Sequence, residues 1–376
     1  MTLQERLAAI SFKGPGFDQI RIAAATVVLL HHCRGIEYAD IRVDPLFHYS
    51  GGYIHFGFLA LAVFFAISGF LVTPSLLRSE NVIDFASHRI LRIFPALTVI
   101  VIASMALLGP VLTTFSPAAY FSDPYLYLYA KNLITLTYDF LPGVINKDEH
   151  PIIINGPVWT LHFEVLCYAT LALASMLGLL RRRSLFLILL LASYAIHLAM
   201  RFDPTLVAVL PDRFLTFIKL FVYFGSGAVL FIFADRIPFS MPFAIGAVAL
   251  IVAALPFGLG AVVMPLCLPY FIIFCGLSAL PGQALVKKRD LSYGVYLIHA
   301  PIVVAFGLLL PNFRTWWLAA VVVLCVTLAL SYLSWTFVEE PALRRKKDVS
   351  NWLNSRFDAW CPGWSNAKRA RVDRNQ

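Results

Sequence analysis

The sequence predicts an all-α integral membrane protein, a bundle of about ten transmembrane helices with one long extracytoplasmic loop. Of its 376 residues, 60% are hydrophobic and 14% are charged, and the mean hydropathy is +0.77. These values are typical of polytopic helical membrane proteins and exclude an ordinary soluble domain. Two further observations support this class: a series of apolar segments of membrane-spanning length, and an uneven distribution of charge between them.

We expect ten spans, each close to the length that a membrane helix needs. They cover residues 18–34, 53–74, 90–113, 158–180, 184–200, 214–234, 241–257, 261–279, 291–310 and 315–338. Several are short or contain Pro and Gly, so neighbouring helices must satisfy the backbone groups that these residues leave free. A polar segment without a small-residue cleavage site precedes the first span, which we therefore expect to be retained.

The charges between the spans predict the orientation. With the N-terminus placed in the cytoplasm, basic residues fall in the cytoplasmic connections and acidic residues predominate on the other side. The cytoplasmic bases are Arg78, Arg89, Arg181, Arg182, Arg183, Arg236, Lys287, Lys288 and Arg289, followed by Arg344, Arg345, Lys346 and Lys347 in the tail. This pattern predicts an even number of spans and both termini in the cytoplasm. Because the net charge of +9 is divided among short loops, we expect no nucleic-acid partner.

Two segments extend beyond the spans. The connection 114–157 is the longest and is rich in Tyr and Phe, which predicts either an interfacial helix in the aromatic belt or a platform on which a sugar ring stacks. Residues 1–341 form one predicted transmembrane domain, and residues 342–376 form a basic cytoplasmic tail of the kind that lies on an anionic leaflet. The six cysteines show neither a disulfide pattern nor a zinc spacing, so we expect no metal site.

Arg21 and His32 are the most informative residues of the first span. Ten residues separate them, so in a helix they share one face and lie roughly 16 Å apart along its axis. Ionisable groups inside a span are costly and usually functional. A neutral imidazole can take a proton from a hydroxyl or accept an acyl group, so Arg21 and His32 are candidate catalytic residues. The adjacent His31 faces elsewhere on the helix.

A second set of polar residues is predicted near the outer ends of the spans. Glu164 lies about two turns inside the fourth span, and Tyr168 shares its helix face. We expect Glu164 to be catalytic, either orienting or polarising His32 or holding the acceptor, and we expect Trp159, Tyr168 and Lys219 to bind an acceptor. The alternative is a structural ion pair between Glu164 and Lys219 that fixes helix packing.

A third set gathers at the predicted cytoplasmic ends. Arg89 and Arg92 are three residues apart, so both guanidinium groups point the same way and suit a phosphate-bearing ligand. With Ser68 and Tyr293 they form the candidate donor-binding set. The alternative for the arginines is ordinary anchoring by the positive-inside rule. Ser68 precedes Gly69, which predicts a close approach of two helices or a gap for a thin ligand.

Six motifs in this order resemble the membrane acyltransferase family 3, the integral-membrane O-acyltransferases of bacterial surface glycans. They are Asp18 to Arg21 with ten residues to His32, Val63 to Phe70, Arg89 to Pro95, Trp159 to Glu164 with Tyr168, Ser292 and Tyr293 to His299, and Glu339 to Pro341. The likeness covers nearly the whole chain. One departure is that His162 and Phe163 precede Glu164, where more polar residues are usual in the family.

The resemblance implies ten transmembrane helices in a bacterial inner membrane. It implies that an acyl group, usually acetyl, passes from cytosolic acyl-CoA to a hydroxyl of a surface or lipid-linked carbohydrate. Acetyl-CoA would then be a co-substrate, with no permanently bound cofactor, and Arg21 and His32 would be the functional pair. Some members carry a fused extracytoplasmic hydrolase-like domain, and we expect none in this sequence.

A transporter or flippase is the second interpretation. Arg21, His32, Glu164 and Lys219 would then line the path of an ion, a small substrate or a glycolipid. Transporters often contain inverted repeats with paired broken helices, and this sequence shows no such symmetry. Consumption of acyl-CoA separates the two interpretations.

Overall fold

The computed structural model describes residues 1–12, 14–35, 44–79, 81–281, 289–310 and 315–360. Within these ranges the chain is helical, and its only β structure is two isolated bridges, Thr2 with Pro238 and Ile145 with Pro151. Apolar side chains and intrahelical hydrogen bonds account for this class, since helices satisfy their own backbone groups in a lipid environment. The predicted all-α membrane fold is confirmed.

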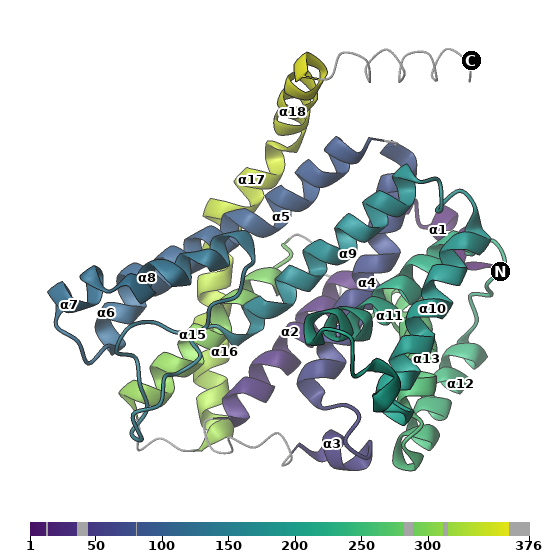
Figure 1. Cartoon of the computed structure of the whole chain (residues 1–376). Helices are drawn as coiled ribbons and strands as arrows, with labels where there is room; N and C mark the ends of the chain where they lie inside the picture. The colour runs from purple at the N-terminus through teal and green to yellow at the C-terminus, as the bar shows by residue number, and fades with distance from the viewer. Residues whose placement is uncertain (13, 36–43, 80, 282–288, 311–314, 361–376) are drawn as a thin grey trace.

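The long helices form one bundle (Figure 1). They are α2 (Phe17–Arg34), α4 (Phe56–Ser79), α5 (Val82–Ala103), α9 (Trp159–Met176), α10 (Arg183–Phe202), α11 (Asp212–Ile232), α12 (Met241–Ala254), α13 (Gly260–Leu277), α15 (Ser292–Leu309) and α16 (Trp316–Ser334). Short helices lie at the ends: α1 (Leu3–Ala9), α3 (Pro45–Tyr49), α6 (Gly109–Leu112), α7 (Pro117–Ser122), α8 (Pro124–Tyr129), α17 (Glu340–Arg344) and α18 (Lys346–Trp360). A π-helical turn joins α5 to α6, and another joins α16 to α17.

Eight helical segments of the described ranges are long and apolar enough to cross a membrane. All ten predicted spans are helical, but two of them do not meet this criterion. The first, α2, contains the charged residues Asp18, Arg21 and Arg34. The other is the shorter apolar helix Met241–Phe257. The length and composition of the described helices therefore do not confirm the predicted count of ten spans.

The helix α5 begins earlier than the sequence predicts. Its first residue is Val82 rather than residue 90, because the side chain of Asn81 caps it by accepting a hydrogen bond from the backbone N–H of Ile83. Arg89 and Arg92 consequently lie inside the helix, about two turns or more from its start. Their guanidinium groups are thereby directed into the bundle and not into a loop.

The helices α4 and α11 form the closest contact of the bundle. A Cβ atom added to Gly69 would lie 1.9 Å from the carbonyl oxygen of Phe224, and one added to Gly227 would lie 2.1 Å from that of Ala66. Only glycine allows backbones to approach this closely. The close helix approach that the sequence predicts at Gly69 is confirmed, and it places α4 at the centre of the molecule.

The connection 114–157 is not one continuous helix. It contains α7, α8 and a 3-10 turn, and the side chain of Asn132 ties this part together by donating to the carbonyls of Tyr129 and Tyr138. Tyr120 is fully buried and its hydroxyl donates to the carbonyl of Met105. Tyr125 and Tyr127 are exposed, so only part of the aromatic set faces outward.

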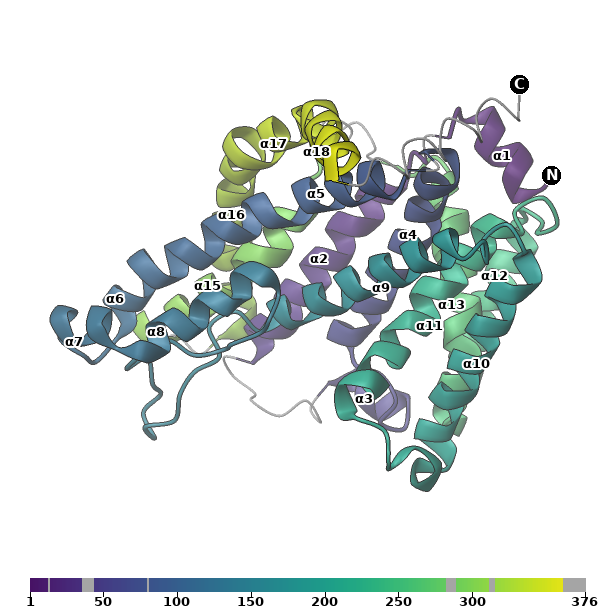
Figure 2. The ribbon, with the colours of Figure 1, turned by 45° about the horizontal axis from the view of Figure 1, so that its top comes forward.

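The helix α18 packs on the start of α5, at the end of the molecule opposite α3 (Figures 1 and 2). The carboxylate of Asp84 accepts hydrogen bonds from Ser350 and from Asn354, the latter at 2.7 Å. This contact attaches the first part of the predicted tail to the helix bundle. The remainder of the tail, residues 361–376, lies outside the described residues.

Candidate active site

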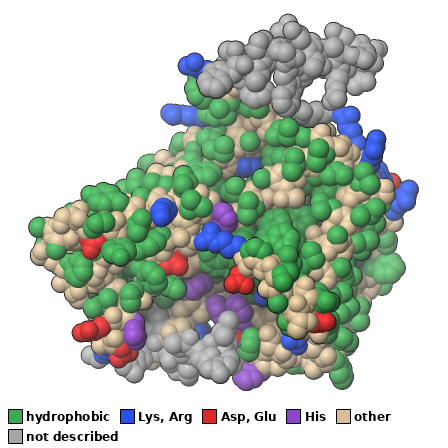
Figure 3. All heavy atoms as spheres, in the orientation of Figure 1, with side chains coloured by type: hydrophobic (Ala, Val, Ile, Leu, Met, Phe, Trp, Pro, Cys, Tyr) green, Lys and Arg blue, Asp and Glu red, His purple; other side chains and the backbone are tan. Residues whose placement is uncertain are grey.

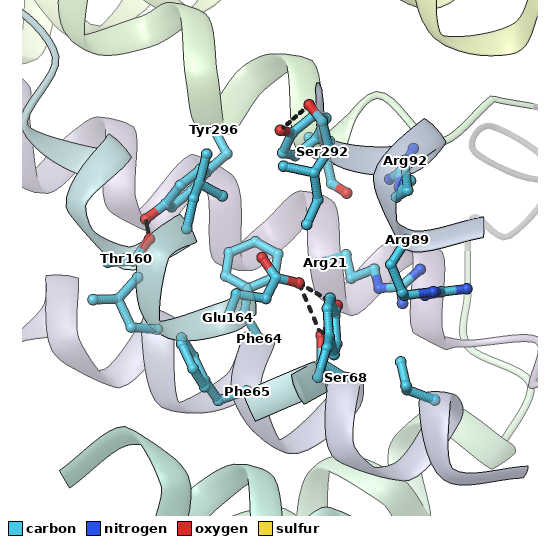
Figure 4. A pocket seen from close by; sticks show the side chains of 16 residues that line it. Arg21, Phe64, Phe65, Ser68, Arg89, Arg92, Thr160, Glu164, Ser292 and Tyr296 are labelled. Atoms are coloured by element: carbon cyan, nitrogen blue, oxygen red, sulfur yellow. Dashed lines mark hydrogen bonds between the residues drawn. The ribbon is translucent and has the colours of Figure 1, made fainter. Parts of the chain in front are cut away.

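A polar pocket of about 760 Å³, counting its part open to solvent, lies among α2, α4, α5, α9 and α15 (Figure 4). Its polar lining consists of Arg21, Ser68, Arg89, Arg92, Thr160, Glu164, Tyr168, Ser292, Tyr293 and Tyr296. Its apolar lining includes Leu61, Phe64 and Phe65 of α4. The arginines lie at one side, and the contact between Thr160 and Tyr296 lies at the other (Figure 4). We call this space the arginine pocket.

Two of the three arginines are neutralised by carboxylates. Arg92 lies 2.6 Å from Asp290 and 3.4 Å from Glu339, and Arg21 lies 3.5 Å from the same oxygen of Asp290. Burial raises the pKa of the Asp290 carboxyl, but Arg92 and Arg21 outweigh this effect, so its pKa is lowered overall. The sequence predicts a catalytic role for Arg21 and a phosphate-bearing ligand for Arg92, and Asp290 is not among the predicted residues. The position of Asp290, two residues before the Ser292 motif, was the available signal.

Arg89 differs from the other two arginines. Its guanidinium group lies 5.8 Å from the centroid of the Tyr168 ring, and the structure places no ion pair on it within the described ranges. Its buried Nε atom has no hydrogen-bond partner there either. An unpaired, partly desolvated cation beside a pocket is suited to bind an anion.

Glu164 lies in the arginine pocket and not beside His32. Its carboxylate accepts a hydrogen bond from the Tyr168 hydroxyl and lies 3.5 Å from the Ser68 hydroxyl (Figure 4). The ion pairs and hydrogen bonds of the described residues do not include a contact between Glu164 and His32 or between Glu164 and Lys219. Both contacts predicted for Glu164, the catalytic and the structural one, are therefore absent there. Tyr168, predicted at the acceptor, faces Arg89 instead.

Glu164 lies in the arginine pocket because of the depth at which α9 begins. The side chain of Asn155 is buried and donates to the carbonyl of Leu297, in the middle of α15. Pro157 and Val158 in the following turn are also buried. The helix therefore begins inside the bundle, and Glu164 lies deeper than its distance from the predicted span end implied.

His32 lies near the other end of α2 and contacts His299. The Nδ1 atom of His32 is 2.8 Å from the carbonyl oxygen of Val28 and 3.2 Å from Nε2 of His299. The Nδ1 atom of His299, which is fully buried, is 2.9 Å from the carbonyl oxygen of Val295. On its other edge, Nε2 of His32 would be 3.9 Å from a Cβ added to Gly156, at the start of α9. In the sequence, His299 ends the motif that begins at Ser292, and no role is predicted for it.

The neighbouring His31 belongs to a separate cluster. Its Nδ1 atom is 3.5 Å from the carboxylate of Asp44, and its ring stacks on that of His55 with centroids 4.8 Å apart. Two imidazoles and a carboxylate suit zinc, but here each has a protein partner. Asp44 also accepts from three backbone N–H groups, and Nδ1 of His55 accepts from the N–H of Phe58 at 3.3 Å. The cluster thus holds α3 against α2 and α4, at the end where histidines gather beside a recess (Figure 3).

The remaining predicted residues lie in three places. Tyr293 lines the arginine pocket, and its hydroxyl donates to the carbonyl of Ile93 at 2.7 Å. Trp159 begins α9, with its ring 5.6 Å from that of Phe163. Lys219 lies 4.2 Å from the centroid of the Phe58 ring. The structure therefore brings the four residues of the candidate donor-binding set into one pocket, and places Trp159 and Lys219 outside it.

Comparison with known proteins decides the family. The model of the acyltransferase domain family matches residues 15–336, most of the chain. This chain belongs to the acyltransferase 3 family. The acyltransferase is 32% identical over 346 residues to a protein of Shigella phage Sf6 named O-acetyl transferase, covering 88% of this chain and 96% of the relative. It is 27% identical to Nodulation protein 10 of Rhizobium leguminosarum bv. viciae, covering 89% and 94%. No solved structure matches it significantly.

The geometry of this acyltransferase separates two chemical environments along one helix. Arg21 is near the first turn of α2 and His32 is near the last, as the ten-residue spacing predicts. The hydroxyls of Ser68 and Tyr168 and apolar side chains of α4 line the arginine pocket together with Arg21. One end of α2 thus carries an arginine of the polar pocket, and the other end carries an imidazole in contact with a second imidazole.

Proposed function

We propose that this acyltransferase transfers an acyl group, acetyl in the first instance, from cytosolic acyl-CoA to a hydroxyl of a surface or lipid-linked carbohydrate. The observation that carries the proposal is the arginine pocket, with Arg89 unpaired in its lining, in a protein of the acyltransferase 3 family. The helix α2 lines this pocket with Arg21 near its start and carries His32 near its end. The name of the Shigella phage relative, O-acetyl transferase, supports acetyl as the acyl group that is transferred.

The donor would enter at the arginine pocket. Arg89 is free to bind a phosphate of CoA, whereas Arg21 and Arg92 must share their charge with Asp290. The wall of Leu61, Phe64 and Phe65 suits the thin, largely apolar arm that joins the phosphates of CoA to its thioester. Ser68 and Tyr293 line the same space and complete the proposed donor-binding set.

His32 would act as the general base. Its Nε2 atom takes the proton of the acceptor hydroxyl as the oxygen forms a bond to the thioester carbonyl carbon. The C–S bond then breaks, and the thiolate of CoA receives the proton back from the imidazolium. The products are the acyl ester and free CoA, so atoms and charges balance without a further reactant. Trp159 and Lys219, with the exposed aromatic residues of the 114–157 connection, are the proposed contacts of the carbohydrate.

The orientation proposed for the chain follows from its charges. Arg89 and the bases of α17 and α18 would face the cytoplasm, with both termini on that side of a bacterial inner membrane. The helices of the bundle would be surrounded by lipid. The acyl group would then cross within the protein, from the arginine pocket toward His32.

The test is acyl transfer by the purified protein in lipid nanodiscs. Given radiolabelled acetyl-CoA and an extract of envelope glycan, the wild-type chain should release CoA and label the glycan, and His32→Ala should do neither while keeping its melting temperature. His31→Ala is the matched control, since His31 contacts Asp44 and His55. Retained transfer in His32→Ala would overturn the assignment. A protein that moves substrate without consuming acetyl-CoA would be a transporter.

A further inference from the structure

The contacts of His32 and His299 allow only one arrangement of protons. Both Nδ1 atoms face backbone carbonyl oxygens within 2.9 Å, so both must carry a hydrogen. A neutral imidazole has a hydrogen on one nitrogen only, which leaves Nε2 of each ring as an acceptor. The 3.2 Å contact is then a hydrogen bond from Nδ1 of His32 to Nε2 of His299. If both hydrogens were instead on the Nε2 atoms, the lone pair on each Nδ1 atom would point at a carbonyl oxygen, which is also an acceptor.

This arrangement leaves Nε2 of His32 unprotonated on the side where space remains. Gly156 has no side chain there, and even a Cβ at that position would be 3.9 Å away. The partner on the other edge, His299, is fully buried and held by α15, whose neighbours are α2 and α16. The orientation of the His32 ring is therefore determined by the contact between α2 and α15 rather than by solvent.

We infer that His299 is a positioning residue for the transfer reaction: it holds His32 in the tautomer whose Nε2 can accept a proton. The inference rests on the proposed role of His32 as general base. When Nε2 takes the proton of the acceptor hydroxyl, Nδ1 keeps its own, and the positive charge is shared by two neutral acceptors, the Val28 carbonyl and His299. A carboxylate performs this task in many hydrolases. A neutral imidazole does so without placing a permanent charge in the bundle.

The inference reassigns a role that the sequence suggested for Glu164. That carboxylate is engaged by Tyr168 and Ser68 in the arginine pocket. The residue that orients His32 is the histidine of the Ser292–His299 motif, 267 residues further along the chain. His299 does not touch the substrate in this scheme and acts only through His32.

Two substitutions separate positioning from packing. His299→Phe keeps an aromatic ring but removes the acceptor, and kcat should fall about 10- to 100-fold, the equivalent of one hydrogen bond to a charged group. His299→Gln offers a carbonyl oxygen to the same proton and should restore much of the rate. The KM for acetyl-CoA should stay unchanged in both. His197→Phe is the matched control, because His197 is also buried but bonds to Tyr53.

A measurement independent of activity completes the test. In protein labelled with 15N at histidine, the resonances of His32 should report a protonated Nδ1 and a bare Nε2, with an N–H···N coupling to His299 that disappears in His299→Phe. Equal loss of kcat in the Phe and Gln variants, or a His32 protonated at Nε2, would overturn the inference while leaving His32 catalytic. An active His32→Ala would instead overturn the proposed function itself.

Discussion

At the scale of single residues, the partners of each ionisable side chain separate structural from binding roles. Arg92 is ion-paired to Asp290 and Glu339, and the Glu339 side chain is only 2% exposed. Arg89, one helical turn away, lies 5.8 Å from the centroid of the Tyr168 ring and has no ion pair among the described residues. The sequence motif could not reveal this difference between Arg89 and Arg92, because a motif identifies residue types and not their partners.

Substitution of the two arginines should therefore have different consequences. Arg92→Ala leaves the buried carboxylate of Glu339 without its arginine, and leaves Asp290 with Arg21 as its arginine partner. This should cost about 3 to 5 kcal/mol of stability, seen as a lower melting temperature. Arg89→Ala should leave that temperature nearly unchanged and weaken binding of CoA at least about tenfold, as expected when a charged contact to phosphate is lost. Isothermal titration with CoA distinguishes the two, and wild-type affinity in Arg89→Ala would contradict the donor assignment.

At the scale of helices, packing rather than hydropathy determines where each residue lies. The apolar segments predicted every long helix, and the spacing in the first span correctly predicted one helix with Arg21 near its start and His32 near its end. The depth of Glu164 was wrong because a hydropathy pattern cannot reveal that Asn155 is buried against α15. The contact between His32 and His299 joins helices far apart in the sequence, so no local pattern predicts it.

The close contact between α4 and α11 provides a test of packing. Gly69→Ala inserts a methyl group 1.9 Å from the Phe224 carbonyl oxygen and should force the helices apart, at a cost of about 1 to 3 kcal/mol. Gly246→Ala is the control: a Cβ there has no atom within 4 Å, and alanine should raise helix stability slightly. Melting temperatures in detergent compare the two. Equal temperatures would contradict the proposed closeness of α4 and α11.

At the scale of the whole molecule, the bundle has two chemically different ends. Bases of α17 and α18 lie at one end, and α3 and its histidine cluster lie at the other (Figures 1 and 3). This separation agrees with the charge asymmetry from which the sequence predicted the orientation. The fold and this polarity were predictable because lipid constrains both, whereas the partners within the site depend on tertiary contacts.

Labelling with a membrane-impermeant maleimide should reveal this polarity in cells. In a chain whose six cysteines are replaced by alanine, Val209→Cys, at a position 88% exposed between α10 and α11, should react from the periplasmic side. Lys347→Cys, exposed in α18, should react only after the inner membrane is permeabilised. The reverse result would mean that the donor pocket opens away from the cytoplasm.

Because Arg21 and His32 lie on a single helix, the distance between the two side chains is fixed as well as their chemical character. Since roughly 16 Å of helix axis separates the two residues, a phosphate held near Arg21 and a carbonyl presented to His32 must be joined by an arm of matching reach. A thioester on a shorter carrier would stop before it reached the imidazole. Choice among donors would then depend on the span between phosphate and sulfur, measured against α2, more than on the identity of the nucleotide.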